Sequence, residues 1–105
     1  MNITLIGMPA SGKSMVGVLL AKRLGMEFID GDLLIQKQEK RLLKEIIEQE
    51  GIERFIQIES EVHEKLQVTN TVIAPGGSVI YSEKAMKHLK EIGTVVYLNV
   101  SYEEI

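Results

Sequence analysis

The residues best suited to chemistry lie near the start of the chain, where positions 7–14 read GMPASGKS. This segment fits the spacing G-x-x-x-x-G-K-[ST] of a phosphate-binding loop, and it lies between a short apolar run at 3–6 and a helical pattern. Gly7 and Gly12 allow a tight bend, so that the backbone N–H groups between them point inward around a β-phosphate. The positive end of the following helix dipole adds to this attraction. The sequence therefore predicts a nucleotide phosphate site.

Two side chains of this loop have specific expected roles. Lys13 is predicted to lie against the β- and γ-phosphates as a point charge. The Ser14 hydroxyl is predicted to ligate Mg²⁺, a hard cation that takes its other oxygens from phosphate and water. The alternative is an ordinary glycine-rich turn before a helix, and the flanking strand and helix patterns weigh against it.

A pair of carboxylates, Asp30 and Asp32, follows a second predicted strand at 27–29. If the strand stays extended through both residues, the two side chains point to the same side. Ligands of open α/β sheets bind at the carboxyl ends of the strands, so both residues are candidates for work on Mg²⁺ or on an attacking hydroxyl. The simpler alternative is a solvated turn with an aspartate that caps the helix starting near Leu33. Next to a phosphate loop, the functional interpretation is preferred.

A third predicted strand, at 71–74, is β-branched and apolar, as is typical of a strand buried on both faces. It leads into the sequence PGGS at 75–78. Gly76 and Gly77 would permit the backbone to approach a substrate closely beside the phosphate loop. Pro-Gly-Gly is also a common turn, and in isolation the motif favours that simpler interpretation.

Helical patterns alternate with these strands, and a fourth strand is predicted at 94–98 after a helix at 82–91. This alternation predicts right-handed crossovers and an α/β fold with a parallel sheet. The first helix should bury Met15, Val16, Leu19, Leu20 and Leu24, and a later helix should bury Phe55, Ile58, Val62 and Leu66. His63 and His88 fall in charged helical stretches and are assigned to solvated positions.

Composition limits the class of protein. The 105 residues, 45% hydrophobic and 26% charged, suit one small globular domain. A net charge of -3 argues against a general role on nucleic acid or on a membrane surface. The chain has no cysteine, which excludes thiol catalysis, and no signal peptide or membrane span is visible, so a cytoplasmic location is expected.

The last residues carry a further signal. SYEE at 101–104 has the S-x-x-E form of a helix capping box, yet the chain stops one residue later. We therefore expect the sequence to be a piece of a longer protein, and a frayed natural tail is the alternative.

The ordered set of motifs resembles shikimate kinase over the whole chain. The segments that carry the resemblance are the phosphate loop, FIDGD at 28–32, FIQIE at 55–59, VIAPGGSVI at 72–80 and GTVVYLNV at 93–100. The resemblance implies a three-layer P-loop kinase fold in one domain at 1–105, with strand order 2-3-1-4 and without the final strand and lid. It also implies transfer of the γ-phosphate of ATP to the 3-hydroxyl of shikimate with Mg²⁺, by a monomer that binds neither nucleic acid nor membrane.

The resemblance assigns roles to single residues. Lys13 and Asp32 are the implied catalytic residues, and Ser14 and Asp30 the implied metal ligands. Asp32, Gly76 and Gly77 are implied to bind the acceptor. The implied nucleotide-binding residues are Gly7, Pro9, Ala10, Ser11, Gly12, Lys13, Ser14 and Met15.

Two positions depart from the family pattern. Ile56 stands where the family has an arginine that pairs with the carboxylate of shikimate, and Ser78 replaces the third loop glycine. Arg54 is close in sequence but lies on a different side of the helix. These departures leave two alternatives open: a kinase of another small acceptor, such as gluconate or a nucleoside monophosphate, and a non-catalytic nucleotide-binding protein.

Overall fold

The chain folds around a parallel sheet in the computed structural model, which describes residues 1–7 and 10–98 and, for residues 10–14, the backbone alone. The strands are β1 (Asn2–Ile6), β2 (Glu27–Asp30), β3 (Thr71–Ala74) and β4 (Gly93–Tyr97). Their order in the sheet is β2-β3-β1-β4, which confirms the predicted α/β fold and strand order. Pro9 and the predicted helix start at 101–104 lie outside the described residues.

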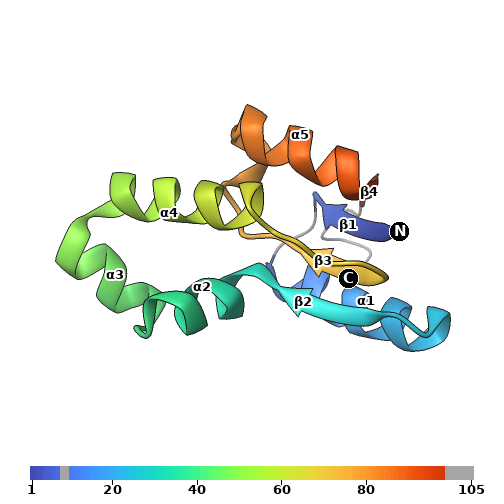
Figure 1. Ribbon diagram of the computed structural model, residues 1–105. Coiled ribbons are helices and arrows are strands. Elements are labelled where there is room, and N and C mark those ends of the chain that lie inside the picture. Colours follow the sequence, from blue (N-terminus) through green and yellow to red (C-terminus); the bar gives the residue numbers. More distant parts are fainter. Residues whose placement is uncertain (8–9, 99–105) are drawn as a thin grey trace.

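Helices cover the sheet and extend beyond its carboxyl edge (Figure 1). They are α1 (Ala10–Leu24), α2 (Gly31–Glu39), α3 (Leu43–Glu50), α4 (Ile52–Glu64) and α5 (Glu83–Ile92), with a short 3-10 helix η1 (Val79–Tyr81). Together α2, α3 and α4 form a lobe that reaches away from the sheet, on the left in Figure 1. Among the described residues, no helix has both the length and the apolar character needed to cross a bilayer.

Each face of the sheet is packed against a different helix layer. Leu5 and Val72 are buried with Ala21 of α1 on one face. Ile73, the next residue after Val72, is buried with Leu89 of α5 on the other face. Successive strand side chains point to opposite faces, so an apolar strand such as β3 fills both layers. The result is a three-layer arrangement.

The face that α1 turns to the sheet differs from the one expected. Met15, Leu19 and Leu24 are 67%, 62% and 52% exposed, so their predicted burial is wrong. Ala21 is buried instead, with Val16 and Leu20 packed partly beside it. The orientation of α1 that buries Ala21 leaves Met15, Leu19 and Leu24 on the outer surface.

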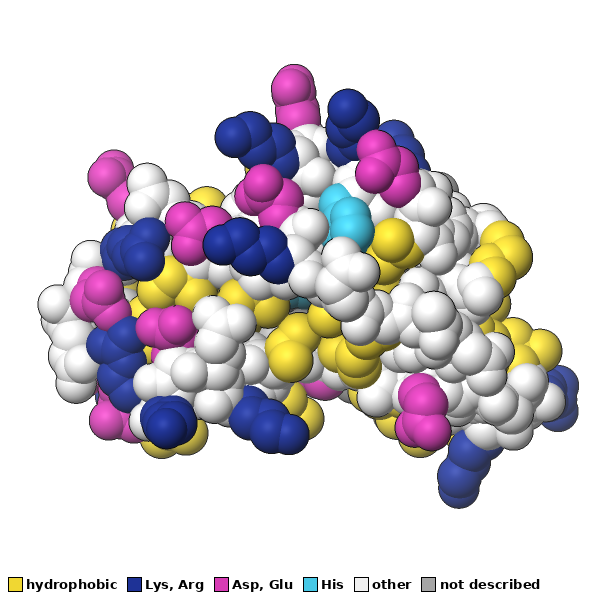
Figure 2. Space-filling view, in the orientation of Figure 1, with side chains coloured by type: hydrophobic (Ala, Val, Ile, Leu, Met, Phe, Trp, Pro, Cys, Tyr) yellow, Lys and Arg dark blue, Asp and Glu magenta, His cyan; other side chains and the backbone are white. Residues whose placement is uncertain are grey.

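The lobe has a core of its own. Ile35 of α2, Ile46 of α3, and Ile58 and Val62 of α4 form a buried cluster. Its surface carries interspersed charges (Figure 2), among them an ion-pair network at the far end in which Arg41 contacts Glu39 and Glu50. The hydrogen bonds that Arg41 donates to Glu50 and then to Glu39 raise the pKa of Arg41.

Asn2 joins separate segments at the opposite end of the sheet. Its side chain is buried and donates to the carbonyl oxygens of Val68, at 2.8 Å, and Ile92, at 3.1 Å. Its Oδ1 accepts a hydrogen bond from the N–H of Thr71 at 2.9 Å. One amide side chain therefore ties the start of β1 to the start of β3 and the end of α5.

The separate core of the lobe gives a first prediction. Ile35→Ala removes a side chain that is fully buried, and we expect it to lower the free energy of unfolding by about 2–5 kcal/mol. The matched control is Leu33→Ala on the same helix, at a residue that is 62% exposed, which should change it by less than about 0.5 kcal/mol. Urea unfolding followed by circular dichroism measures both, and equal effects of the two changes would contradict the packing described.

Candidate active site

The carboxyl ends of three strands meet at one edge of the sheet. β3 pairs in parallel with β1 on one side and with β2 on the other, and the last β2 residue, Asp30, lies opposite Ala74 of β3. Gly7, Gly31 and Pro75, which follow the three strands, therefore lie along this edge. Two strand spacings place the end of β1 about 10 Å from the end of β2, a distance that a nucleotide's phosphates can span.

The phosphate loop leads from β1 into α1. Gly7 has φ +99, in the region that favours glycine, and α1 begins at Ala10, within the motif at 7–14. The first four N–H groups of a helix have no partner within that helix, and they attract anions. The start of α1, which follows the end of β1, therefore has the backbone groups that the predicted phosphate site requires. The structure describes only the backbone of Ser11, Lys13 and Ser14, so the roles of their side chains remain predictions.

The two aspartates occupy different kinds of position. β2 ends at Asp30, which is the N-cap of α2, and its Oδ1 accepts hydrogen bonds from the N–H groups of Asp32 at 2.9 Å and Leu33 at 3.3 Å. Asp32 lies in the first turn of α2. The condition that the strand stays extended through both residues is not met, because the chain turns into a helix directly after Asp30. An aspartate does cap this helix, but it is Asp30 rather than the one directly before Leu33. A carboxylate can accept about four hydrogen bonds, so capping is compatible with metal binding.

Loop 75–78 is held against α4 by a buried carboxylate. Glu59 is 2% exposed, and its Oε1 accepts hydrogen bonds from the N–H of Ser78 at 2.8 Å and from the Ser78 hydroxyl. A Cβ atom built on Gly76 would lie 2.3 Å from Oε2 of Glu59. Gly76 is therefore required by close packing against α4, and the pair of glycines is more than a generic turn. Gly77 is exposed.

His63 lies one turn after Glu59 on α4 and packs beneath the Asp30–Asp32 turn. Its Nδ1 is 2.7 Å from the carbonyl oxygen of Glu59, and because a carbonyl only accepts, Nδ1 carries the proton. A Cβ atom on Gly31 would lie 2.5 Å from His63 Nε2 and 3.0 Å from the N atom of Gly76. The two turns and α4 are therefore in direct contact.

The expectation that both histidines are solvated is wrong. His63 is 0% exposed. His88 is partly buried, and its Nε2 lies 2.6 Å from the carbonyl oxygen of Leu66. Sequence reasoning thus missed both Glu59 and His63 as parts of this region. The signal was present, because residues four apart on a helix share a face and both flank the apolar stripe that contains Ile58 and Val62.

Ile56 is 43% exposed and lies on the side of α4 that faces loop 75–78 and α5. Arg54 does not take its place. The Arg54 guanidinium donates to Gln57 Oε1 at 3.3 Å and lies 3.7 to 3.8 Å from Glu61 and Glu50. Arg54 is thus paired with side chains of the lobe itself.

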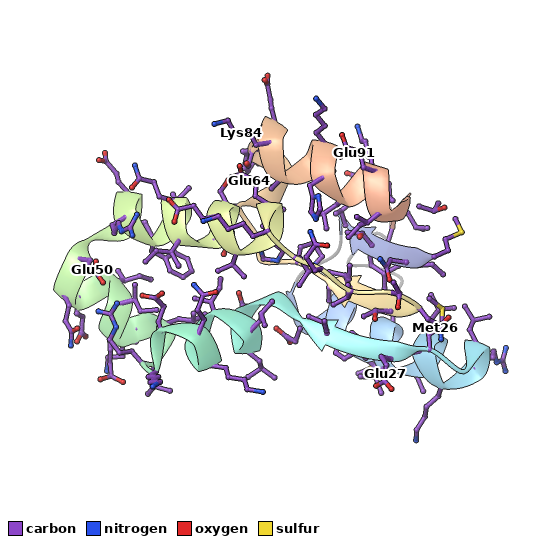
Figure 3. All side chains as sticks on the ribbon, in the orientation of Figure 1. Met26, Glu27, Glu50, Glu64, Lys84 and Glu91 are labelled. Carbon is purple, nitrogen blue, oxygen red and sulfur yellow. The ribbon has the colours of Figure 1, made fainter. Side chains whose placement is uncertain are left out.

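A groove of about 500 Å³ runs between α4 and the start of α5. Figure 3 shows Glu64 of α4 and Lys84 of α5 at this junction. The groove is lined by Ile56, Gln57, Ser60, Glu61, Glu64, Ser78, Tyr81, Ser82 and Lys84. Within the described part of the chain, no group of three or more acidic, histidine or cysteine side chains could hold a metal ion.

Comparison with known proteins identifies the family. The shikimate kinase family model matches residues 9–105. The shikimate kinase of Paracidovorax citrulli (strain AAC00-1) is 44% identical over the whole of this chain and 59% of its own length. That of Clostridium botulinum (strain 657 / Type Ba4) is 44% identical over 99% of this chain and 62% of its own. The chain thus spans about three fifths of these relatives.

Solved structures agree with the sequence comparison. A shikimate kinase from Acinetobacter baumannii in complex with shikimate superposes with a TM-score of 0.87 and 37% identity, covering 97% of this chain and 57% of that one. The enzyme from Aquifex aeolicus vf5 gives a TM-score of 0.78 and 34% identity, covering 99% and 62%. Because the family model, the sequences and the fold coincide, this chain belongs to the shikimate kinase family.

Proposed function

We propose that the protein transfers the γ-phosphate of ATP to the 3-hydroxyl of shikimate, and that Ser14 and Asp30 would hold the Mg²⁺ that accompanies the nucleotide. The observation that most supports this function is the meeting of three segments at one sheet edge: the phosphate loop, the Asp30–Asp32 turn and loop 75–78. We also propose that residues 1–105 form a single domain that acts as a cytoplasmic monomer, without nucleic acid or membrane.

The nucleotide side of the site would act by charge and position. The first-turn amides of α1 and Lys13 bind the phosphates, with the neighbouring residues from Gly7 to Met15 around them. Bound Mg²⁺ supplies neutralisation of the phosphate charge. Asp30 fits this use because it is a carboxylate whose position is already fixed by capping α2. Phosphoryl transfer needs little covalent chemistry from the protein, so such positioning is the main contribution.

The acceptor side would supply orientation and take the proton. Asp32 binds the 3-hydroxyl of shikimate and accepts its proton as the hydroxyl oxygen bonds to the γ-phosphorus. The bond from that phosphorus to the β–γ bridging oxygen breaks, and ADP leaves. Gly76 and Gly77 allow the acceptor to lie close to the loop backbone.

The role of Lys13 gives a direct test. Lys13→Ala should lower kcat/KM for ADP formation by about 10²–10³, because it removes a preorganised charge from the transferred phosphate. The control is Lys22→Ala, an exposed position in the last turn of the same helix, which should leave the rate unchanged. A coupled ADP assay with shikimate measures both. Transfer that survives Lys13→Ala would place the phosphate elsewhere.

Substitutions of Asp30 can separate its role as the cap of α2 from its proposed role as a ligand of Mg²⁺. Asparagine caps helices as well as aspartate does, so Asp30→Asn should leave the melting temperature nearly unchanged. It should still raise the Mg²⁺ concentration needed for half-maximal rate several-fold, since a charged ligand is lost. Asp30→Ala should in addition lower stability by about 0.5–2 kcal/mol. An unchanged Mg²⁺ titration for Asp30→Asn would restrict Asp30 to capping.

Ile56 predicts a weakened contact with the acceptor. The arginine that the family carries at this position pairs with the carboxylate of shikimate, so Ile56→Arg should lower the KM for shikimate about tenfold and leave the KM for ATP unchanged. Arg54→Ala is the matched control, because Arg54 already contacts Glu50, Glu61 and Gln57. Steady-state kinetics with each substrate varied decides. An unchanged KM for shikimate in Ile56→Arg would mean that residue 56 does not face the acceptor.

A further inference from the structure

One face of α4 contacts both segments on the acceptor side of the site, the Asp30–Asp32 turn and loop 75–78. Glu59 and His63 lie one helical turn apart and are both almost fully buried. Glu59 binds loop 75–78 through Ser78, and His63 packs against Gly31 between the two aspartates. The N atom of Gly76 is 3.0 Å from the position of a Cβ on Gly31, so the two turns also contact each other.

The Glu59 contact depends on the side chain of Ser78. A buried carboxylate is costly unless hydrogen bonds replace those it made to water. Both hydrogen bonds to Oε1 come from Ser78, one from its N–H at 2.8 Å and one from its hydroxyl. A glycine or alanine at position 78 would keep the first and lose the second. Ser78 is thus the residue that closes the contact between this loop and α4.

We propose that Ser78 and Glu59 form a latch that positions loop 75–78 for the acceptor, and that both are positioning residues for the proposed phosphoryl transfer, on which this inference rests. Two adjacent glycines give the loop much conformational freedom, which must be lost when a substrate binds. The latch removes part of that freedom beforehand, so the acceptor binds an ordered loop. The nucleotide site, at the start of α1, does not involve the latch.

The test compares three serine variants of the chain by hydrogen–deuterium exchange and by kinetics. In Ser78→Ala, the amides of the segment 75–79 should exchange about fivefold faster or more, because the loop opens locally. The KM for shikimate should rise about three- to tenfold, while the KM for ATP stays within about twofold. Ser78→Thr keeps the hydroxyl and should behave as the unmodified chain.

Ser60→Ala is the matched control on the same helix. It removes a hydroxyl whose Oγ lies 2.5 Å from Ser82 Oγ, outside loop 75–78, and it should leave exchange of that loop and both KM values unchanged. If Ser78→Ala does not fold, Glu59→Met gives the same reading, since it removes both accepting oxygens and nearly preserves the length of the side chain.

The outcomes separate this inference from the proposed function. Faster loop exchange in Ser78→Ala, absent in Ser78→Thr and Ser60→Ala, supports the latch even if the unmodified chain transfers no phosphate, a result that would count against the proposed function alone. Equal loop exchange in all variants, or a KM for ATP that rises as much as that for shikimate, overturns the latch.

Discussion

The parallel pairing of β1, β3 and β2 is the constraint on which the rest of this structure depends. Parallel strands need crossover connections, and each crossover returns the chain so that the carboxyl ends of neighbouring strands meet at one edge. The register that places Asp30 beside Ala74 therefore brings the turn after β2 to the loop after β3. Any chemistry at this edge is assembled from residues far apart in sequence, and none of these segments could form the site alone.

Helix α4 has two structural roles: it packs within the lobe, and it packs against the turns at the edge of the sheet. Ile58 and Val62 of α4 bury themselves against α2 and α3 and hold the lobe together. Glu59 and His63, beside them on the same helix, press against the turns at the sheet edge. A Cβ at Gly31 would collide with His63, and a Cβ at Gly76 would collide with Glu59. The packing of α4 against the two turns therefore requires glycine at both positions. The stability of the lobe and the geometry of the acceptor side are consequently coupled.

The sequence was sufficient for the fold but not for the environment of each side chain. Alternating strand and helix patterns predicted a parallel α/β sheet, because connection rules leave few topologies, and the family resemblance supplied the strand order. The buried face of α1 was predicted wrongly, since periodicity favours Met15 and Leu19, whereas the orientation of α1 in the structure buries Ala21. His63 was predicted as solvated because charged neighbours surround it in sequence, and only the packing of Gly31 shows that it is enclosed. The positions of the Lys13 and Ser14 side chains stay predictions.

The side chain of Asn2 has a consequence for the order in which the molecule forms. Its partners, Val68, Thr71 and Ile92, are 66, 69 and 90 positions away along the chain. Contacts of such long sequence separation close large loops and form slowly. Asn2 can therefore complete its hydrogen bonds only after Ile92 has been added to the chain and folded beside it. The base of the sheet is thus completed late, and α2, α3 and α4 can pack together before the first strand reaches its final place.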